Sequence, residues 1–168
     1  MISYGKHFIQ DDDIEEVSKV LKSDWLTQGP YIEKFEKDLN SFFGAKYSSA
    51  VCNGTAALHL VALSLNLSKN DIVITSPITF LATVNCIEYV GATPDFVDID
   101  SSSYTIDVKK LEQRILSHRK KGKTVKAIIG VDYAGHPCDW KNIKKVADKY
   151  DIVLINDNCH ALGASLNG

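Results

Sequence analysis

The feature that most constrains the fold of this chain is an alternation between short apolar runs and longer runs with helical spacing. Residues 72–75 (IVIT) and 152–155 (IVLI) are almost entirely apolar, as expected of strands buried on both faces. Segments with helical spacing separate such runs along the chain. Apolar strands joined by helices form a parallel sheet covered on both sides. We therefore predict an α/β fold, a three-layer αβα sandwich with a mostly parallel sheet.

The same two periodicities predict the other elements. The predicted helices are residues 14–21, 31–43, 55–65, 82–90, 108–116 and 140–150. The predicted strands are residues 49–52, 72–75, 96–99, 125–131 and 152–155. The helix at residues 55–65 (TAALHLVALSL) is nearly all apolar, so we expect it to be buried.

Composition excludes several classes of protein. The 168 residues are 45% hydrophobic and 24% charged, as in ordinary soluble globular proteins, and a net charge of -2 gives no basic field for nucleic acid. We find no apolar stretch of about 18 residues for a membrane span, and no signal peptide. The basic run at residues 118–123 indicates a solvated helix end.

The four cysteines show neither CxxC pairs nor a metal-ligand spacing with the histidines. They are Cys52, Cys86, Cys138 and Cys159. We expect them to be reduced and mostly buried, in a cytoplasmic protein without a metal site.

Ligands of parallel α/β sheets bind beyond the carboxyl ends of the strands. The strand predicted at residues 49–52 is followed by residues 53–57 (NGTAA), at a helix start. Small residues allow close approach to the backbone, and helix N-terminal N–H groups with the Thr55 hydroxyl suit a phosphate. The turn is equally suited to be a plain helix N-cap. It lacks the GK[ST] ending of a P-loop and the G-x-G-x-x-G pattern of dinucleotide sites.

Aromatic and acidic residues follow the other strands. Phe80 could stack on a flat heterocycle, although a core position is the commoner fate of a single aromatic residue. Asp132 could cap the backbone or line a site. Asp157 follows a buried strand, where a carboxylate needs a partner; it could hold a cationic ring nitrogen or cap a turn. His160 could line the same crevice or be a satisfied, partly buried histidine.

Together these segments resemble the DegT/StrS-type sugar-nucleotide aminotransferases, a branch of the fold-type-I pyridoxal-phosphate enzymes. The matching segments, in chain order, are residues 26–30 (LTQGP), 53–58 (NGTAAL), 76–80 (SPITF), 91–94 (GATP) with 96–100 (FVDID), and 157–163 (DNCHALG). The likeness covers nearly the whole chain. Residues 79–80, 131–135 and 160–163 look most like the transaminase branch of pseudaminic acid biosynthesis, whereas the NGTAA turn looks more like perosamine-type enzymes.

The resemblance implies pyridoxal 5'-phosphate (PLP) or pyridoxamine 5'-phosphate (PMP) as the cofactor. It implies that Gly54, Thr55 and Ala56 hold the cofactor phosphate and that Phe80 stacks on the pyridine ring. Asp157 would pair with the pyridine nitrogen and keep it protonated, because a nearby anion favours the charged form. That protonation makes the ring an electron sink.

The resemblance also implies a histidine near the phenolic oxygen of the cofactor, His160, and a sugar-nucleotide pocket. The pocket residues would be Tyr4, Asp24, Trp25, Leu26 and Thr27. We accordingly predict an N-terminal helix and substrate loop over residues 1–30 and a partial PLP-binding large domain over residues 31–168. The expected partners are a nucleotide-sugar substrate, an amino-acid donor and, for the full-length enzyme, a second copy.

Transamination needs a lysine that holds the cofactor as a Schiff base. In the resembling family it follows the Asp-x-x-His motif by roughly two dozen residues, and this sequence ends at Gly168. We therefore expect an N-terminal fragment, inactive alone, of an enzyme that moves an amino group from glutamate to a 4-keto-6-deoxy nucleotide sugar. Two alternatives stay open. One is a non-catalytic α/β module that binds PLP, PMP or a nucleotide sugar, and the other is the dehydratase branch, in which a histidine replaces the lysine.

Overall fold

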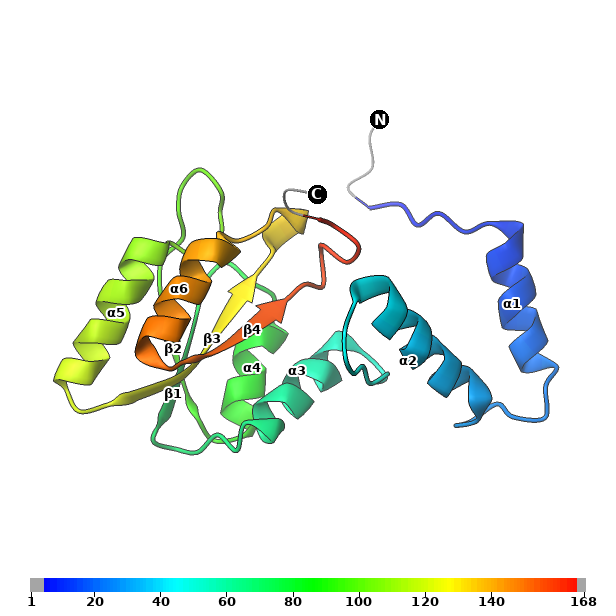
Figure 1. The fold of residues 1–168 in the computed structure, drawn as a ribbon, viewed down its shortest axis with the longest axis horizontal. Helices are drawn as coiled ribbons and strands as arrows, with labels where there is room; N and C mark the ends of the chain where they lie inside the picture. The colour runs from blue at the N-terminus through cyan, green and yellow to red at the C-terminus, as the bar shows by residue number, and fades with distance from the viewer. Residues whose placement is uncertain (1–4, 166–168) are drawn as a thin grey trace. The chain divides into compact units, whose positions relative to one another are not determined.

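The computed structural model describes residues 5–165, and Figure 1 labels their helices and strands. The chain divides into two compact units with a boundary between Ala50 and Val51. Tyr4, predicted to line the substrate pocket, lies outside the described residues. No helix among residues 5–165 is long and apolar enough to cross a bilayer.

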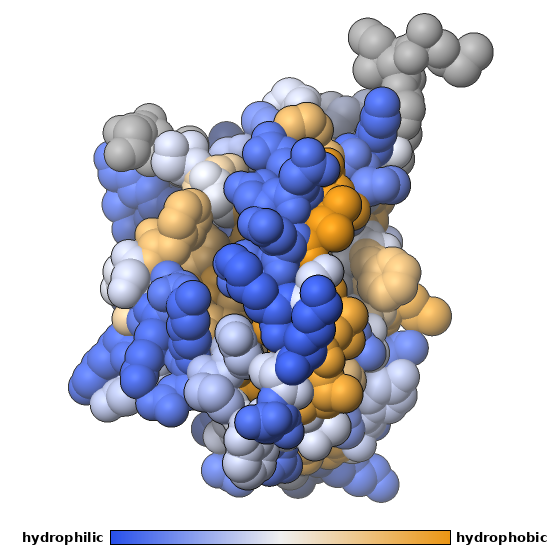
Figure 2. Space-filling view, turned by 90° about the vertical axis from the view of Figure 1, so that its right-hand side faces the viewer, coloured by the Kyte–Doolittle hydropathy of each residue, from blue (hydrophilic) through white to orange (hydrophobic). Residues whose placement is uncertain are grey.

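The first unit contains two amphipathic helices, α1 (Asp11–Leu21) and α2 (Pro30–Phe43). Three aspartates open α1, where the helix dipole favours negative charge. Pro30 begins α2, and Gly44 ends it with a φ of 62°, a left-handed conformation that glycine adopts without strain. Neither helix has a buried residue within the described part of the chain, and Figure 2 shows apolar side chains at the surface beside hydrophilic ones.

The second unit is built on a parallel sheet that has four strands within the described residues. Their spatial order is β2 (Thr93–Phe96), β1 (Asp71–Thr75), β3 (Thr124–Val131) and β4 (Val153–Asp157). All neighbouring strands are parallel. The helices of this unit are α3 (Gly54–Ser64), α4 (Leu81–Tyr89), α5 (Val108–Lys120) and α6 (Trp140–Tyr150), and a short 3-10 turn, η1 (Tyr133–Gly135), follows β3.

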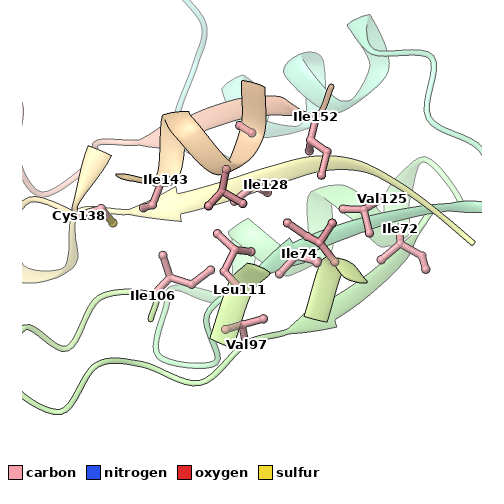
Figure 3. Close-up of a cluster of buried hydrophobic side chains, with 13 residues drawn as sticks. Ile72, Ile74, Val97, Ile106, Leu111, Val125, Ile128, Cys138, Ile143 and Ile152 are labelled. Carbon is pink, nitrogen blue, oxygen red and sulfur yellow. The ribbon is translucent and has the colours of Figure 1, made fainter. Parts of the chain in front are cut away.

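A hydrophobic core lies on each face of the sheet. On one face, Leu111 of α5 and Ile143 of α6 pack with Ile74 and Ile128 of the central strands (Figure 3). On the other face, α3 and α4 pack against the sheet through residues that include Leu58 and Cys86. The predicted α/β architecture, with a parallel sheet between two helical layers, is confirmed.

Two of the predicted strands differ from the structure. Residues 49–52 form no strand, because donors near this segment are taken by α2: Ser48 Oγ donates to the Glu36 carbonyl at 2.7 Å, and the Ala50 amide donates to Glu36 Oε1 at 2.8 Å. The strand predicted at residues 96–99 instead occupies Thr93–Phe96. It includes Pro94, which has no N–H group and is tolerated because β2 lies at an edge of the described sheet.

Two predictions about burial are also wrong. The apolar helix α3 buries only Leu58 and Ala62, and several of its other apolar side chains are exposed, namely Leu60, Val61 and Leu63. The reason is geometric: one face of α3 meets the sheet and α4, and within the described residues of the second unit its opposite face meets no second apolar layer.

The basic run is not fully solvated either, because His118 is half-buried and pairs with Asp95 of β2. Arg114 binds the same carboxylate through Nε and Nη2, each at 2.6 Å from an Asp95 oxygen. Burial raises the pKa of Asp95, but the hydrogen bonds from Arg114 and His118 together outweigh burial and hold that pKa at about 2. This cluster ties α5 to the edge strand.

Candidate functional site

A cavity of about 240 Å³ opens at the carboxyl ends of the strands in the second unit. Its walls come from the starts of α3 and α4, the end of β3 and the end of β4. The lining residues are Gly54, Thr55, Leu58, Phe80, Ala82, Val131, Tyr133, Asp157, Cys159 and His160. Of the six predicted cofactor-binding residues, the structure brings five to this cavity, and Ala56 is the exception.

The start of α3 supplies a positive helix end to the cavity. Asn53 caps the helix, since its Oδ1 accepts a hydrogen bond from the Ala56 amide at 2.8 Å. The Ala56 N–H therefore already has a partner, whereas Gly54 and Thr55 line the cavity. A Cβ on Gly54 would lie 3.3 Å from Cys159 Sγ, so glycine lets this turn approach the end of β4. The turn is a cap and also offers an anion site at Gly54 and Thr55.

Asp157 is the last residue of β4 and is 6% exposed. Thr83 Oγ1 donates to its Oδ2 at 2.7 Å, and the Cys159 amide donates to its Oδ1 at 3.4 Å. Both partners are neutral, and no ion pair of residues 5–165 includes Asp157. Because a buried carboxylate is stabilised by a cation, the donor set fits a ligand that brings a protonated nitrogen.

Phe80 precedes α4 as its N-cap residue and is 71% exposed. The core interpretation of this side chain is therefore wrong. Its ring stands in the cavity wall with the apolar side chains of Leu58, Ala82 and Val131. An exposed aromatic ring beside apolar walls suits a flat heterocycle.

The loop after β3 orients His160. The Ala134 amide donates to His160 Nδ1 at 3.2 Å, so the proton of a neutral imidazole belongs on Nε2. Ala134 has a φ of 53°, and a Cβ on Gly135 would lie 3.1 Å from the His160 carbonyl oxygen. The tight turn at Ala134 and Gly135 thus fixes which ring nitrogen can donate to a ligand.

Asp132, the other acid at a strand end, does not line the cavity. Its Oδ1 accepts hydrogen bonds from the Cys138 amide at 2.8 Å and from Trp140 Nε1 at 2.9 Å. Of the two interpretations left open for Asp132, the structure favours backbone capping.

Several residues of the site are not predicted from the sequence. Tyr133 and Cys159 line the cavity, and Thr83 holds Asp157 from behind. Cys159 lies between Asp157 and His160 in sequence, and this position could have indicated that it lines the same cavity. Thr83 has no such signal in the sequence.

The cysteines split evenly between surface and interior, contrary to the expectation that most are buried: Cys52 and Cys159 are exposed. A hydrogen bond to Asp157, with burial, raises the pKa of Cys159 to about 11. Burial and the charge of Asp157 raise the pKa of Cys86 to about 11, and burial with Asp132 raises that of Cys138 to about 12. No group of His, Cys, Asp and Glu able to hold a metal ion occurs among the described residues.

The predicted substrate residues lie in the first unit, in the loop between α1 and α2. They are Asp24, Trp25, Leu26 and Thr27, and all four are exposed. Their part in a sugar-nucleotide pocket stays a prediction.

Comparison with known proteins gives the family. The sequence model of the DegT/DnrJ/EryC1/StrS aminotransferase family matches residues 7–168. The uncharacterized protein MJ1066 of Methanocaldococcus jannaschii is 44% identical over 160 residues, which are 95% of this chain and 40% of that protein. The chain spans about 40% of the length of the curated relatives that it matches.

Solved structures agree. Helicobacter pylori PseC, an aminotransferase involved in pseudoaminic acid biosynthesis, matches with a TM-score of 0.86 and 32% identity, over 99% of this chain and 43% of that chain. Escherichia coli GDP-4-keto-6-deoxy-D-mannose-3-dehydratase with bound hydrated PLP matches with a TM-score of 0.88 and 28% identity, over 98% of this chain and 42% of that chain.

Matching structures of Spr1654 from Streptococcus pneumoniae exist in a PLP form and a PMP form, at 32% and 31% identity and a TM-score of 0.86. PLP and PMP are therefore cofactors of the proteins that this chain resembles. The family match over residues 7–168, together with these structures, shows that the chain belongs to the DegT/DnrJ/EryC1/StrS aminotransferase family.

Proposed function

We propose that this chain forms the cofactor-binding part of an aminotransferase that moves an amino group from glutamate to a 4-keto-6-deoxy sugar on a nucleotide. The observation that carries the proposal is the convergence on one cavity of a helix start, an exposed aromatic ring and a buried carboxylate that has no cationic partner among residues 5–165. Such a cavity would accept three groups of PLP: the phosphate at the helix start, the pyridine ring against the aromatic side chain, and the protonated pyridine nitrogen beside the carboxylate.

Each cavity residue has a role that follows from its contacts. Gly54 and Thr55 would bind the phosphate at the positive end of α3. Phe80 would stack on the ring and exclude water from one face. Asp157 would hold the proton on the pyridine nitrogen, and His160 would donate from Nε2 to the phenolic oxygen. PLP, when bound, supplies an electron sink for the carbanion formed in amino transfer.

The substrate side of the proposal depends on the first unit and on relatives. We propose that Tyr4 and the loop residues Asp24 to Thr27 contribute to the nucleotide-sugar pocket, that Ala56 supports the phosphate turn, and that the enzyme is a homodimer. The match to PseC supports a substrate of the pseudaminic acid type.

The cofactor half of the proposal is tested by titrating PLP into this chain and following its absorbance and the quenching of tryptophan fluorescence. We expect saturable binding that Thr55→Val weakens by about fivefold, since one hydroxyl hydrogen bond is worth about 1 kcal/mol. Asp148→Asn, which changes an exposed acid on α6, is the matched control and should bind normally. Equal binding by Thr55→Val and the control would contradict the proposed phosphate turn.

No lysine is among the cavity residues that the structure describes. Borohydride reduction of the PLP complex of this chain should therefore leave no single lysine labelled in preference to the exposed lysines, as judged by peptide mass spectrometry. Amino transfer is tested on a protein of the relatives' full length that contains this chain, with glutamate and a 4-keto-6-deoxy nucleotide sugar. Formation of 2-oxoglutarate and an aminated sugar in equal amounts is the expected result.

A second candidate function is sugar dehydration. The close structural match to the E. coli 3-dehydratase favours it. The same full-length assay separates the two functions, because a dehydratase removes water from the sugar and leaves its product without the added amino group. A non-catalytic module would bind PLP in the titration and yield neither product.

A further inference from the structure

The cavity acid, Asp157, accepts a hydrogen bond from a buried hydroxyl that does not line the cavity. Thr83 on α4 is fully buried and donates from Oγ1 to Asp157 Oδ2 at 2.7 Å, across 74 positions of sequence. Thr79 Oγ1 lies 2.9 Å from Thr83 Oγ1 and donates to it. Because a hydroxyl carries one proton and an ionised carboxylate can only accept, the direction of this chain of hydrogen bonds is fixed from Thr79 through Thr83 to Asp157.

The chain of hydrogen bonds makes the two carboxylate oxygens different. Oδ2 is occupied by the short, charge-assisted bond from Thr83, whereas the bond from the Cys159 amide to Oδ1 is longer, at 3.4 Å, and the weakly donating Cys159 thiol also bonds this carboxylate. Oδ1 is therefore the oxygen with capacity to accept a hydrogen bond from a ligand in the cavity. Without the Thr83 hydroxyl, Oδ2 would be a buried acceptor without a short partner, and the carboxylate would turn toward other donors.

We infer that Thr83, supported by Thr79, is a positioning residue that turns Asp157 Oδ1 toward the protonated pyridine nitrogen of the cofactor. The inference rests on the proposed function. Thr83 itself does not line the cavity and need not touch the cofactor. It acts from α4, on the face of the sheet opposite α5 and α6, so it couples the placement of α4 to the acid at the end of β4.

The test uses PLP labelled with ¹⁵N in the pyridine ring and four forms of this chain: wild type, Thr83→Val, Thr83→Ser and Thr79→Val. Valine keeps the shape of threonine and removes the hydroxyl. We expect Thr83→Val to weaken PLP binding about tenfold, as expected for the loss of a hydrogen bond to a charged group. Its pyridine ¹⁵N resonance should move from the protonated toward the unprotonated position.

The two other variants define the mechanism. Thr83→Ser keeps the donor and should restore both affinity and resonance to within about twofold of wild type. Thr79→Val leaves the bond from Thr83 to Asp157 in place and removes only its support, so its affinity should fall by about twofold to threefold.

The outcomes separate this inference from the function on which it rests. A wild-type chain that fails to bind PLP overturns the proposed function and the inference together. A wild-type chain that binds, with a Thr83→Val variant whose affinity and resonance are unchanged, overturns the positioning role alone. A lower melting temperature and affinity with an unmoved resonance would indicate a purely structural threonine and would also overturn it. If Thr83→Val does not fold, the pyridine ¹⁵N resonance is measured on Thr83→Ala instead. The same two results, a shifted or an unshifted resonance, then support or overturn the positioning role.

Discussion

Asp132 directly follows β3 and Asp157 ends the adjacent parallel strand β4, and the two residues are buried to a similar degree, at 4% and 6% exposure. One oxygen of Asp132, Oδ1, accepts hydrogen bonds from the Cys138 amide and the Trp140 indole, and both donors belong to the segment that follows β3. Asp157 receives its short hydrogen bond from Thr83, on a helix that precedes it by 74 positions, and faces a cavity. An acid after a buried strand is therefore structural or functional according to where its donors come from.

The largest effect should come from removing Asp132. Asp132→Ala leaves two buried donors, the Cys138 amide and Trp140 Nε1, without an acceptor, so we expect a loss of about 3 kcal/mol in the free energy of unfolding. Asp157→Ala should cost less stability, because one of its partners is a hydroxyl that can rotate to another acceptor. Urea denaturation of both variants measures the difference. Equal losses would break the comparison between the two acids.

A second test concerns the packing beside Asp132. A Cβ on Gly130 would lie 2.5 Å from the Trp140 ring, so Gly130→Ala should displace the tryptophan and destabilise the protein by about 2 kcal/mol. Gly54→Ala is the matched variant beside Asp157, where the nearest atom is Cys159 Sγ at 3.3 Å. It should change stability little but weaken PLP binding. Thermal melts and PLP titration of the same two samples check this contrast, which fails if Gly54→Ala is the less stable variant.

A third test addresses the charge of Asp157. Asp157→Asn keeps the side-chain shape and removes the anion that would pair with the pyridine nitrogen, so PLP affinity should fall at least tenfold, or about 1.4 kcal/mol. Asp132→Asn should leave PLP affinity of the folded fraction unchanged. Isothermal calorimetry at matched folded concentrations distinguishes them, and an unchanged affinity for Asp157→Asn would remove the acid from the proposed cofactor site.

The smallest expected effect concerns Asp95, a half-buried acid of β2, which differs from the other two acids in having cationic partners. Its pKa in the folded protein, about 2, lies below the ordinary value of 3.8. The stabilisation is therefore complete above about pH 4 and is lost as the pH falls toward about 2. Because Arg114 is partly exposed, we expect Asp95→Asn to cost about 1 kcal/mol near neutral pH and progressively less as the pH falls through about 2. Melting curves across this range measure it.

Most of the layered fold could be predicted from sequence, because continuous apolar strands and helical spacing are local signals. The predictions failed where a partner distant in sequence decides the outcome. Glu36 takes donors of residues 48–50 that a strand would have used, and Pro94 is accepted only because β2 lies at an edge. Burial of α3 could not be read from its composition, since exposure depends on what covers its second face.

The candidate site was predictable to the extent that chemistry follows strand ends. Phe80, Asp157 and His160 were singled out in this way, and the structure places all three at one cavity. Asp132 has an equivalent position in sequence, and its hydrogen bonds from the Cys138 amide and Trp140 Nε1 distinguish it from Asp157. Thr83 gave no signal of its own, because a threonine in an apolar helix is ordinary until its hydrogen-bond partner is known.

The raised pKa values of three thiols make the remaining cysteine a convenient handle. Maleimides and iodoacetamides react with thiolates, and Cys86, Cys138 and Cys159 hold their protons until about pH 11 or 12. Cys52 is exposed and lies two positions before the start of α3. A fluorophore attached there would report on occupancy of the phosphate turn without any engineered residue.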